Sequence, residues 1–172
     1  MKLRNLLNKD VDNILEWMKD EDIVQFFRFE TSEINENVVL NFISEAHSNK
    51  NSYHFAIVNE YDEYMGTVSL KNIDKYHKNA EYSISLRKKA MGKGYSYFAG
   101  NEMLKFAFEK LNLERVYLNV LSKNIKSIIY CEKLGFKYEG EFKNHLYLKG
   151  NFENLKWYAL LKEQYKCLKQ NY

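Results

Sequence analysis

The stretch Leu86-Arg87-Lys88-Lys89-Ala90-Met91-Gly92-Lys93-Gly94-Tyr95-Ser96 decides the fold, because it joins a predicted strand to a predicted helix. Glycines let a backbone approach an anion closely, and the first N–H groups of a helix have no partner within the helix. The helix dipole adds about half a positive charge at that end, and the four basic side chains raise the potential further. The segment therefore predicts a phosphate-binding turn, although a plain strand-to-helix turn with a solvated basic loop has the same pattern.

Two common phosphate-binding motifs are absent from this loop. No GKS or GKT follows the glycines, which argues against a nucleoside triphosphatase loop. A full GxGxxG is also missing, which argues against a dinucleotide site.

Hydrophobic periodicity on either side of the loop predicts alternating strands and helices. Asp10 is the expected cap of the first helix, and Asn35 or Ser32 of the second. The expected strands cover residues 3–7, 53–58, 64–70, 81–86, 115–121, 137–147 and 155–161, and the expected helices cover about 11–18, 38–46, 95–111 and 124–134. The fold class is therefore α/β with mixed α+β character: one domain over residues 1–172, with a single central mixed sheet of about seven strands flanked by about four helices.

Composition excludes several classes of protein. No apolar run approaches the roughly 18 residues that span a bilayer, and no secretory signal is visible, so we expect a cytoplasmic protein without a membrane partner. The formal net charge of +3 is too small to indicate nucleic-acid binding. Cys131 and Cys167 are expected to be reduced thiols, and the four scattered histidines show no metal-ligand spacing, so no metal is expected.

A second informative segment covers residues 124–136, with Asn124 before a predicted helix, Tyr130 on it and Gly135 after it. Asn124 can cap the helix and Gly135 can end it. On periodicity alone, a capped amphipathic helix with a tyrosine at its rim is the favoured interpretation.

In this order and spacing, the two segments together resemble the GNAT acetyltransferase family. That family has a Q/R-x-x-G-x-G/A loop, where this chain has Met91 in place of Gln or Arg and Ser96 in place of Gly or Ala. Its later signature, N-x-x-(A/S)-x-x-x-Y-x-K-x-G-F, is nearly complete here, with the tyrosine six residues after the asparagine, and the matching residues are Asn124, Ser127, Tyr130, Lys133, Gly135 and Phe136.

The resemblance implies the GNAT fold and acetyl-CoA as co-substrate. The loop would bind the coenzyme A pyrophosphate mainly through backbone N–H groups. Backbone N–H groups near Ile84 and Leu86 would hold the pantetheine and polarise the thioester carbonyl. The implied cofactor-binding residues are Ile84, Leu86, Met91, Gly92, Lys93, Gly94, Tyr95, Ser96, Asn124 and Ser127.

The resemblance also implies direct attack of a primary amine on the thioester, which needs a base and a donor to the leaving thiolate. Glu81 is the candidate base and His77 the second, with a water chain as a further route, while a solvated strand-end carboxylate accounts equally for Glu81. Tyr130 is the candidate donor. Because tyrosine has a pKa of about 10 and a thiol about 8.5, hydrogen-bond donation is favoured over outright protonation.

The resemblance implies a primary amine of a small molecule as the acceptor, with spermidine or a protein N-terminus as alternatives to an amino-sugar nucleotide. The N-terminal half and the chain's end resemble ribosomal-protein, spermidine and amino-sugar-nucleotide acetyltransferases, and the stretch from Trp17 to Arg28 favours the sugar branch. Arg28, Glu30 and Glu33 lie where the family builds its acceptor pocket, although acidic residues there also suit the first turn of a helix. A homodimer is a further expectation from the family.

Two other classes of function stay open at this point. One is a non-catalytic acyl-CoA-binding or regulatory module on the same fold, which would keep the loop and lose the function of Tyr130. The replacement of the family's Gln or Arg by Met91 is the feature that leaves this alternative open. A basic nucleic-acid-binding domain would use Lys88, Lys89 and Lys93 with the nearby tyrosines Tyr95 and Tyr97.

Overall fold

A computed structural model describes residues 1–28 and 33–170 and groups the chain into two compact units. Unit 1 comprises Met1–Asn72 and Ser83–Met103, and unit 2 comprises Ile73–Tyr82 and Leu104–Tyr172. We describe each unit by itself. The expectation of one domain over residues 1–172 stays a prediction.

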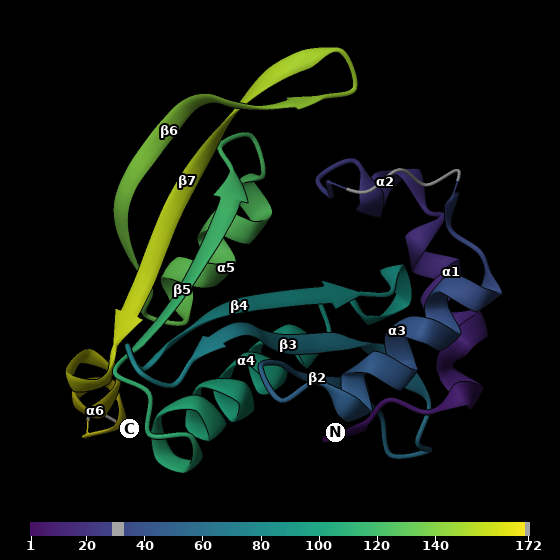
Figure 1. The fold of residues 1–172 in the computed structure, drawn as a ribbon, viewed down its shortest axis with the longest axis horizontal. Helices are drawn as coiled ribbons and strands as arrows, with labels where there is room; N and C mark the ends of the chain where they lie inside the picture. The colour runs from purple at the N-terminus through teal and green to yellow at the C-terminus, as the bar shows by residue number, and fades with distance from the viewer. Residues whose placement is uncertain (29–32, 171–172) are drawn as a thin grey trace. The chain divides into compact units, whose positions relative to one another are not determined.

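The strands form one seven-stranded sheet in the order β1-β2-β3-β4-β5-β7-β6 (Figure 1), which confirms the predicted mixed sheet. The pairing of β4 with β5 is parallel, and the pairings β1–β2, β2–β3, β5–β7 and β6–β7 are antiparallel. The described part of the chain has six α-helices where about four were expected. The two additional helices are the four-residue α2 and the C-terminal α6.

Unit 1 is built from the N-terminal strands and the helices that pack on them. Its strands are β1 (Lys2–Asn5), β2 (Tyr53–Val58), most of β3 (Tyr64–Asp74) and the end of β4 (Asn79–Leu86). Its helices are α1 (Val11–Met18), α2 (Glu21–Val24), α3 (Glu36–Ser48) and α4 (Tyr95–Lys105), with short 3₁₀ turns at η1 (Asn8–Asp10) and η3 (Lys88–Ala90).

An apolar cluster holds unit 1 together, as the periodicity of its helices predicts. Its buried members come from the segment after β1, from α1, α2 and α3, and from β2 and β3: Leu6, Val11, Ile14, Trp17, Ile23, Val39, Ile43, Ala56, Val58 and Tyr64. The two polar tips in this cluster are paired, because Trp17 Nε1 donates to the Tyr64 hydroxyl at 3.1 Å and that hydroxyl lies 2.7 Å from Thr67 Oγ1. Buried polar groups cost stability unless they are paired in this way.

The two predicted helix caps of unit 1 have different outcomes. Asn35 caps α3, since its side chain accepts a hydrogen bond from Val38 N at 3.2 Å. Asp10 precedes α1 but makes no side-chain cap bond, so that prediction is wrong. Its buried carboxylate instead accepts hydrogen bonds from the Arg4 guanidinium at 2.7 and 2.8 Å. The alternative cap Ser32 lies outside the described residues.

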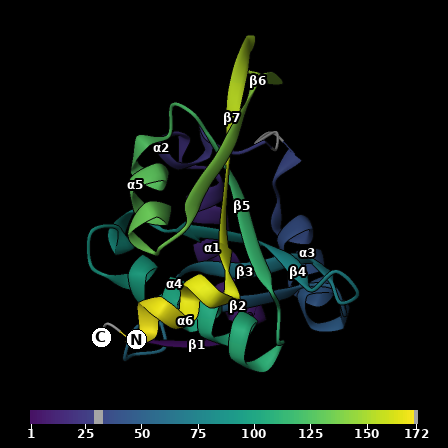
Figure 2. The same ribbon diagram turned by 90° about the vertical axis from the view of Figure 1, so that its left-hand side faces the viewer.

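Unit 2 is dominated by a long C-terminal hairpin (Figure 2). Its strands are the start of β4, β5 (Arg115–Leu121), β6 (Lys137–Leu148) and β7 (Asn151–Leu161). In both views β6 and β7 run well beyond the end of β5 (Figures 1 and 2). The helices are α5 (Ile125–Lys133) and α6 (Lys162–Gln170), and the predicted helix over 95–111 ends in a π-helical turn, η4 (Phe106–Lys110).

Helix α6 was not predicted, because its sequence is mostly charged and polar. Its buried residue, Tyr165, packs against the rest of unit 2. The Tyr165 ring stacks on Phe108 with centroids 4.8 Å apart, and its hydroxyl lies 2.8 Å from Glu109 Oε1. Lys162, at the start of the helix, also bonds to Asn112 and Glu114, so tertiary contacts hold a short helix that would be marginal alone.

The close approach of β3 to the end of β4 yields a stability prediction for unit 1. A Cβ on Gly66 would overlap the carbonyl oxygen of Ser85 and lie 2.7 Å from Leu86 Cδ2. We therefore expect Gly66→Ala to cost roughly 1–3 kcal/mol of unfolding free energy. Thermal unfolding should show a drop of about 2–4 °C in melting temperature per kcal/mol.

The matched control is Gly140→Ala, because no atom lies within 4 Å of the Cβ position there. Equal melting temperatures for the two variants would contradict the close approach at Gly66.

Candidate functional site

Strand β4 carries the first group of predicted site residues. The first three residues of β4 pair in parallel with β5: Asn79 with Arg115, Ala80 with Val116 and Glu81 with Tyr117. After these pairs, β4 continues to Leu86. Side chains alternate along a strand. Tyr82 is accordingly buried, at 3% exposed, while its neighbour Glu81 is half-buried on the other face.

The predicted phosphate loop lies in unit 1, between η3 and α4. Gly92 and Gly94 have φ values of 73° and 82°, which other residues rarely adopt. Among the described residues, no atom lies within 4 Å of a Cβ placed on Gly92, and Met1 Cε alone does so at Gly94, at 3.9 Å. Both glycines therefore leave their backbone open to a ligand directly before the first turn of an eleven-residue helix. This geometry fits a pyrophosphate.

The other predicted residues of this group lie on either side of the two glycines. Ile84 and Leu86 are half-buried on β4, Met91 is 44% exposed, and Tyr95 and Ser96 begin α4. Their contacts with coenzyme A stay predictions.

Three of the four basic residues near the loop are paired with acids of unit 1. Arg87 is buried and bonds to Glu16, to Glu63 and to the Tyr64 carbonyl oxygen, the last at 3.0 Å. Lys88 pairs with Asp22 at 2.6 Å and Lys89 pairs with Glu63. Lys93 is exposed. We therefore expect backbone N–H groups and Lys93 to provide most of the attraction for an anion. Because Lys88 and Lys89 are paired with acids, they add little net positive charge for binding nucleic acid.

Asn124 is the N-cap of α5, as the sequence predicts. Its side-chain oxygen accepts a hydrogen bond from Ser127 N at 3.2 Å, and its carbonyl oxygen accepts one from Ile128 N at 3.1 Å. Gly135 follows the helix with φ 96°. The cap fixes the start of α5, and the roles of Asn124 and Ser127 in cofactor binding stay predictions.

The Tyr130 hydroxyl on α5 lies 2.6 Å from the hydroxyl of Tyr82 on β4. Both residues belong to unit 2. Burial raises the pKa of Tyr82 above its ordinary value. Tyr82 is therefore a neutral phenol at any working pH, and it holds the hydroxyl of the predicted donor at a fixed place.

Glu81 lies opposite Tyr117, which belongs to an aromatic group on the same face of unit 2. The Tyr117 ring packs on Trp157 with centroids 5.9 Å apart, and Trp157 packs on Phe142 at 5.6 Å. Burial first and the charge of Glu81 second raise the pKa of Tyr117. A carboxylate beside aromatic faces is an environment that attracts an ammonium group.

His77, the second candidate base, lies in the turn that precedes β4. Its Nδ1 is 2.7 Å from Asp74 Oδ2, its ring meets Tyr76 edge-on, and its side chain is 67% exposed. This histidine is bound to an acid of its own turn and sits four residues before Glu81. The roles of Glu81 and His77 as candidate bases stay predictions.

The predicted acceptor residues belong to unit 1. Arg28 and Glu33 are exposed, Glu33 in the segment before α3, while Glu30 lies outside the described residues. The neighbouring Glu36 occupies the first turn of α3, where an acid suits the helix dipole. An acceptor role for Arg28, Glu30 and Glu33 stays a prediction.

Sequence reasoning missed three residues of this region: Tyr82, Tyr117 and Trp157. One signal was available for Tyr82, because it alternates with Glu81 on a predicted strand and a buried tyrosine hydroxyl needs a partner. The pairing of Tyr117 with Trp157 depends on the β5–β7 register, which the sequence does not reveal.

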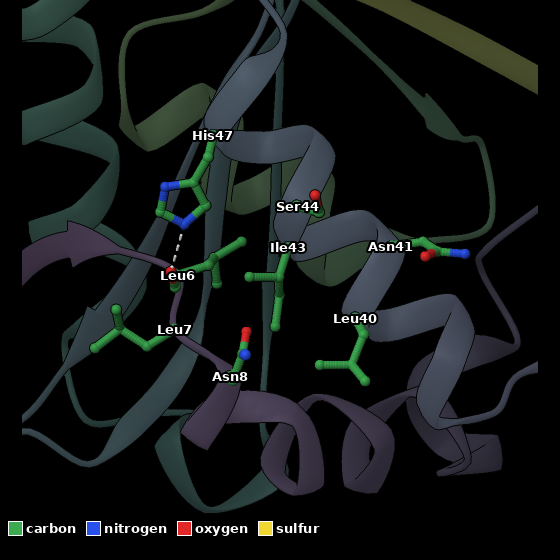
Figure 3. Close-up of a pocket in the computed structure, with 8 residues that line it drawn as sticks. All are labelled: Leu6, Leu7, Asn8, Leu40, Asn41, Ile43, Ser44 and His47. Atoms are coloured by element: carbon green, nitrogen blue, oxygen red, sulfur yellow. Dashed lines mark hydrogen bonds between the residues drawn. The ribbon is translucent and has the colours of Figure 1, made fainter.

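A cavity of about 750 Å³ in unit 1 contains none of the predicted site residues (Figure 3). It lies between the segment after β1 and α3, where His47 Nε2 is 2.8 Å from the Leu6 carbonyl oxygen. Its lining is Leu6, Leu7, Asn8, Leu40, Asn41, Ile43, Ser44 and His47.

Among residues 1–28 and 33–170, no three His, Cys, Asp or Glu side chains are grouped so that they could hold a metal ion. Within the same residues, no helix has both the length and the apolar character that a membrane crossing requires.

Comparison with known proteins identifies the family. A model described as the acetyltransferase (GNAT) domain matches residues 1–137. The chain is 35% identical over 101 residues to the putative ribosomal N-acetyltransferase YdaF of Bacillus subtilis, a match that covers 59% of this chain and 55% of that protein. It is 28% identical over 165 residues to the spermidine N(1)-acetyltransferase of Escherichia coli, covering 96% of this chain and 88% of that one.

Among solved structures, the chain resembles a spermidine N-acetyltransferase from Vibrio cholerae in complex with CoA and spermine. The TM-score is 0.88 at 24% identity, covering 96% of this chain and 97% of that one. This likeness confirms the predicted fold.

Capping by Asn124 yields a prediction for α5. Asn124→Ala removes the acceptor for Ser127 N and should cost about 1 kcal/mol of unfolding free energy. Urea unfolding measures the loss, and hydrogen exchange should show faster opening of the first turn of α5.

The control Asn124→Asp keeps an oxygen acceptor and should stay close to the wild type in stability. A loss in Asn124→Asp as large as that in Asn124→Ala would mean that the side-chain cap does not stabilise α5.

Proposed function

Because the chain belongs to the acetyltransferase (GNAT) family, we propose that it is an acetyl-CoA-dependent N-acetyltransferase acting on a primary amine of a polyamine such as spermidine. The observation that carries the proposal is the Tyr130 hydroxyl of α5, held 2.6 Å from a buried tyrosine of β4, the strand that also carries Glu81. Two relatives named as spermidine N(1)-acetyltransferases, from Vibrio cholerae and Escherichia coli, support the choice of acceptor.

Acetyl-CoA supplies an activated acetyl group as a thioester. The open backbone at Gly92 and Gly94, with Lys93 between them, binds its pyrophosphate at the start of α4. Met91 replaces a side chain that often contacts phosphate in the family. Backbone N–H groups carry the main part of such binding, so this replacement weakens the contact without removing it.

In unit 2, Glu81 acts as the base and Tyr130 as the donor to the leaving group. Glu81 takes a proton from the substrate ammonium, directly or through water, and frees the nitrogen lone pair to attack the thioester carbon. Tyr130 donates a hydrogen bond to the sulfur as the carbon–sulfur bond breaks. The carbon–nitrogen bond forms as the carbon–sulfur bond breaks, and the second proton of the attacking nitrogen ends on the departing thiolate. The balance is one N-acetyl product, one CoA thiol and one proton released through Glu81.

The aromatic residues next to Glu81 favour a polyamine as the acceptor. A polyamine alternates ammonium groups with methylene chains, so it needs a carboxylate and apolar faces close together. Tyr117 supplies such a face opposite Glu81, and Trp157 packs on Tyr117. Arg115, which is on β5 with Tyr117, is paired with Glu139, so the positive charge of Arg115 is largely compensated.

An activity assay tests the acetyltransferase and its acceptor class together. Thiol release from acetyl-CoA is measured with spermidine, with a 4-amino-4,6-dideoxy sugar nucleotide and with peptides that carry free Ser or Ala N-termini. Thiol release with spermidine alone supports the polyamine proposal. Thiol release with another amine of the panel and not with spermidine contradicts it and identifies that amine as the acceptor. Tight acetyl-CoA binding with no release from any amine supports the non-catalytic alternative.

Tyr130→Phe tests the donor to the leaving thiolate. We expect a kcat lower by about 10²–10⁴ with KM for acetyl-CoA unchanged, because the hydroxyl acts on the sulfur only as it leaves. The control is Tyr138→Phe on β6, whose side chain is 54% exposed and should tolerate the change. A kcat within a few-fold of the wild type for Tyr130→Phe removes this hydroxyl from the mechanism.

Glu81→Gln tests the base. The variant keeps the shape of the side chain but loses its proton affinity, so kcat/KM for the amine should fall about 10²-fold or more at neutral pH. The loss should shrink as the pH rises, because more of the amine is then already deprotonated. Glu60→Gln, an exposed turn residue, is the control. A loss that stays constant with pH would assign Glu81 to amine binding alone.

A further inference from the structure

We propose that Tyr82 is a positioning residue for the transfer reaction: its buried hydroxyl donates a hydrogen bond to the Tyr130 oxygen and directs the Tyr130 hydrogen to the leaving sulfur. This inference deepens the proposed function and rests on it. It adds a residue that the family signature, which begins at Asn124 and ends at Phe136, does not contain.

The geometry of Tyr82 leaves its hydroxyl little freedom. The residue is 3% exposed, on the face of β4 opposite Glu81. Its ring packs on Phe136, itself 1% exposed, with centroids 5.8 Å apart. The hydroxyl then meets Tyr130 at 2.6 Å, a short distance for a hydrogen bond between two hydroxyl groups.

Burial decides which tyrosine donates. In the part of the chain that the structure describes, Tyr130 is the one hydrogen-bond partner of the Tyr82 hydroxyl. If Tyr130 were the donor, the hydrogen of Tyr82 would be left in the apolar interior without an acceptor, which is costly. Tyr82 therefore donates, and the Tyr130 oxygen accepts.

The direction of this bond affects the chemistry of Tyr130. A hydrogen bond donated to a phenol oxygen stabilises the charge that builds on it when the phenol gives up its own hydrogen. Chains of hydrogen bonds also polarise one another in a low-dielectric interior. Burial keeps Tyr82 neutral, as its raised pKa indicates, so it acts as a donor throughout the pH range of the reaction. Tyr130 is thereby both oriented and made a stronger donor to sulfur.

The test is a double-mutant cycle with Tyr82→Phe and Tyr130→Phe, read as kcat with spermidine. Tyr82→Phe alone should lower kcat about 5- to 10-fold, as the loss of one hydrogen bond implies, and leave both KM values unchanged. In the Tyr130→Phe background the same change should alter kcat by less than about twofold, because Tyr82 acts through Tyr130. An equal loss in both backgrounds, or none in either, overturns the proposal.

A matched control separates positioning from general support of the fold. Tyr158 on β7 is 2% exposed and, like Tyr82, sends its hydroxyl to a residue of α5, here Glu132 Oε1 at 3.3 Å. Tyr158→Phe should therefore leave kcat within about twofold of the wild type. A loss in Tyr158→Phe as large as in Tyr82→Phe would show that any buried hydroxyl bonded to α5 matters and would overturn the specific role.

A spectroscopic arm does not depend on turnover. In protein with ¹³Cζ-labelled tyrosine, Tyr82→Phe should shift the Tyr130 resonance, and Tyr158→Phe should leave it in place. An unmoved Tyr130 resonance in Tyr82→Phe contradicts the hydrogen bond, whatever the activity. If the resonance moves but no amine is acetylated, the hydrogen-bonded pair stands, while the proposed function and with it the positioning role in transfer fail.

Discussion

The buried guanidinium of Arg87 is the constraint on which the candidate site in unit 1 depends. A charge taken out of water must be paired, and Arg87 is paired by Glu16, Glu63 and the Tyr64 carbonyl oxygen. Its own N–H donates to Met65 O at 2.9 Å, so backbone and side chain are both fixed. Because Arg87 follows β4 directly, this network fixes where the strand ends and where the glycine loop begins.

Strand alternation sets the chemistry that β4 carries in unit 2. Glu81 and Tyr82 are neighbours in sequence, so their side chains point to opposite faces. On one face Glu81 lies opposite Tyr117, next to Trp157, and on the other Tyr82 meets Tyr130. In the proposed mechanism, the base and the donor to sulfur are therefore supplied on opposite sides of one strand. A shift of one residue in the register would exchange them.

Two of the residues matched to the family motifs also have plain structural roles. Asn124 is a helix cap, and Gly135 has a positive φ where the helix ends. A resemblance alone does not separate such roles from contacts with a cofactor. Gly92 and Gly94 are different, because among the described residues nothing crowds the Cβ position of Gly92 and only Met1 Cε lies near that of Gly94, while both have backbones that other residues avoid. Their conformation leaves room for the ligand that we propose there.

The sequence by itself determined what depends on neighbours along the chain. Periodicity predicted the strands and the helices α1, α3 and α5. The residue type at Asn35 and Asn124 predicted the helix caps, and the spacing of two motifs indicated the family. It failed at Asp10, which pairs with Arg4 instead of capping, and at α6, which Tyr165 docks. Only the tertiary structure decided the partners of Tyr82, Tyr117 and Trp157 and the neutralisation of Lys88 and Lys89. Such pairs join residues about 26 to 66 positions apart, and no local propensity encodes which long-range register or ion pair forms.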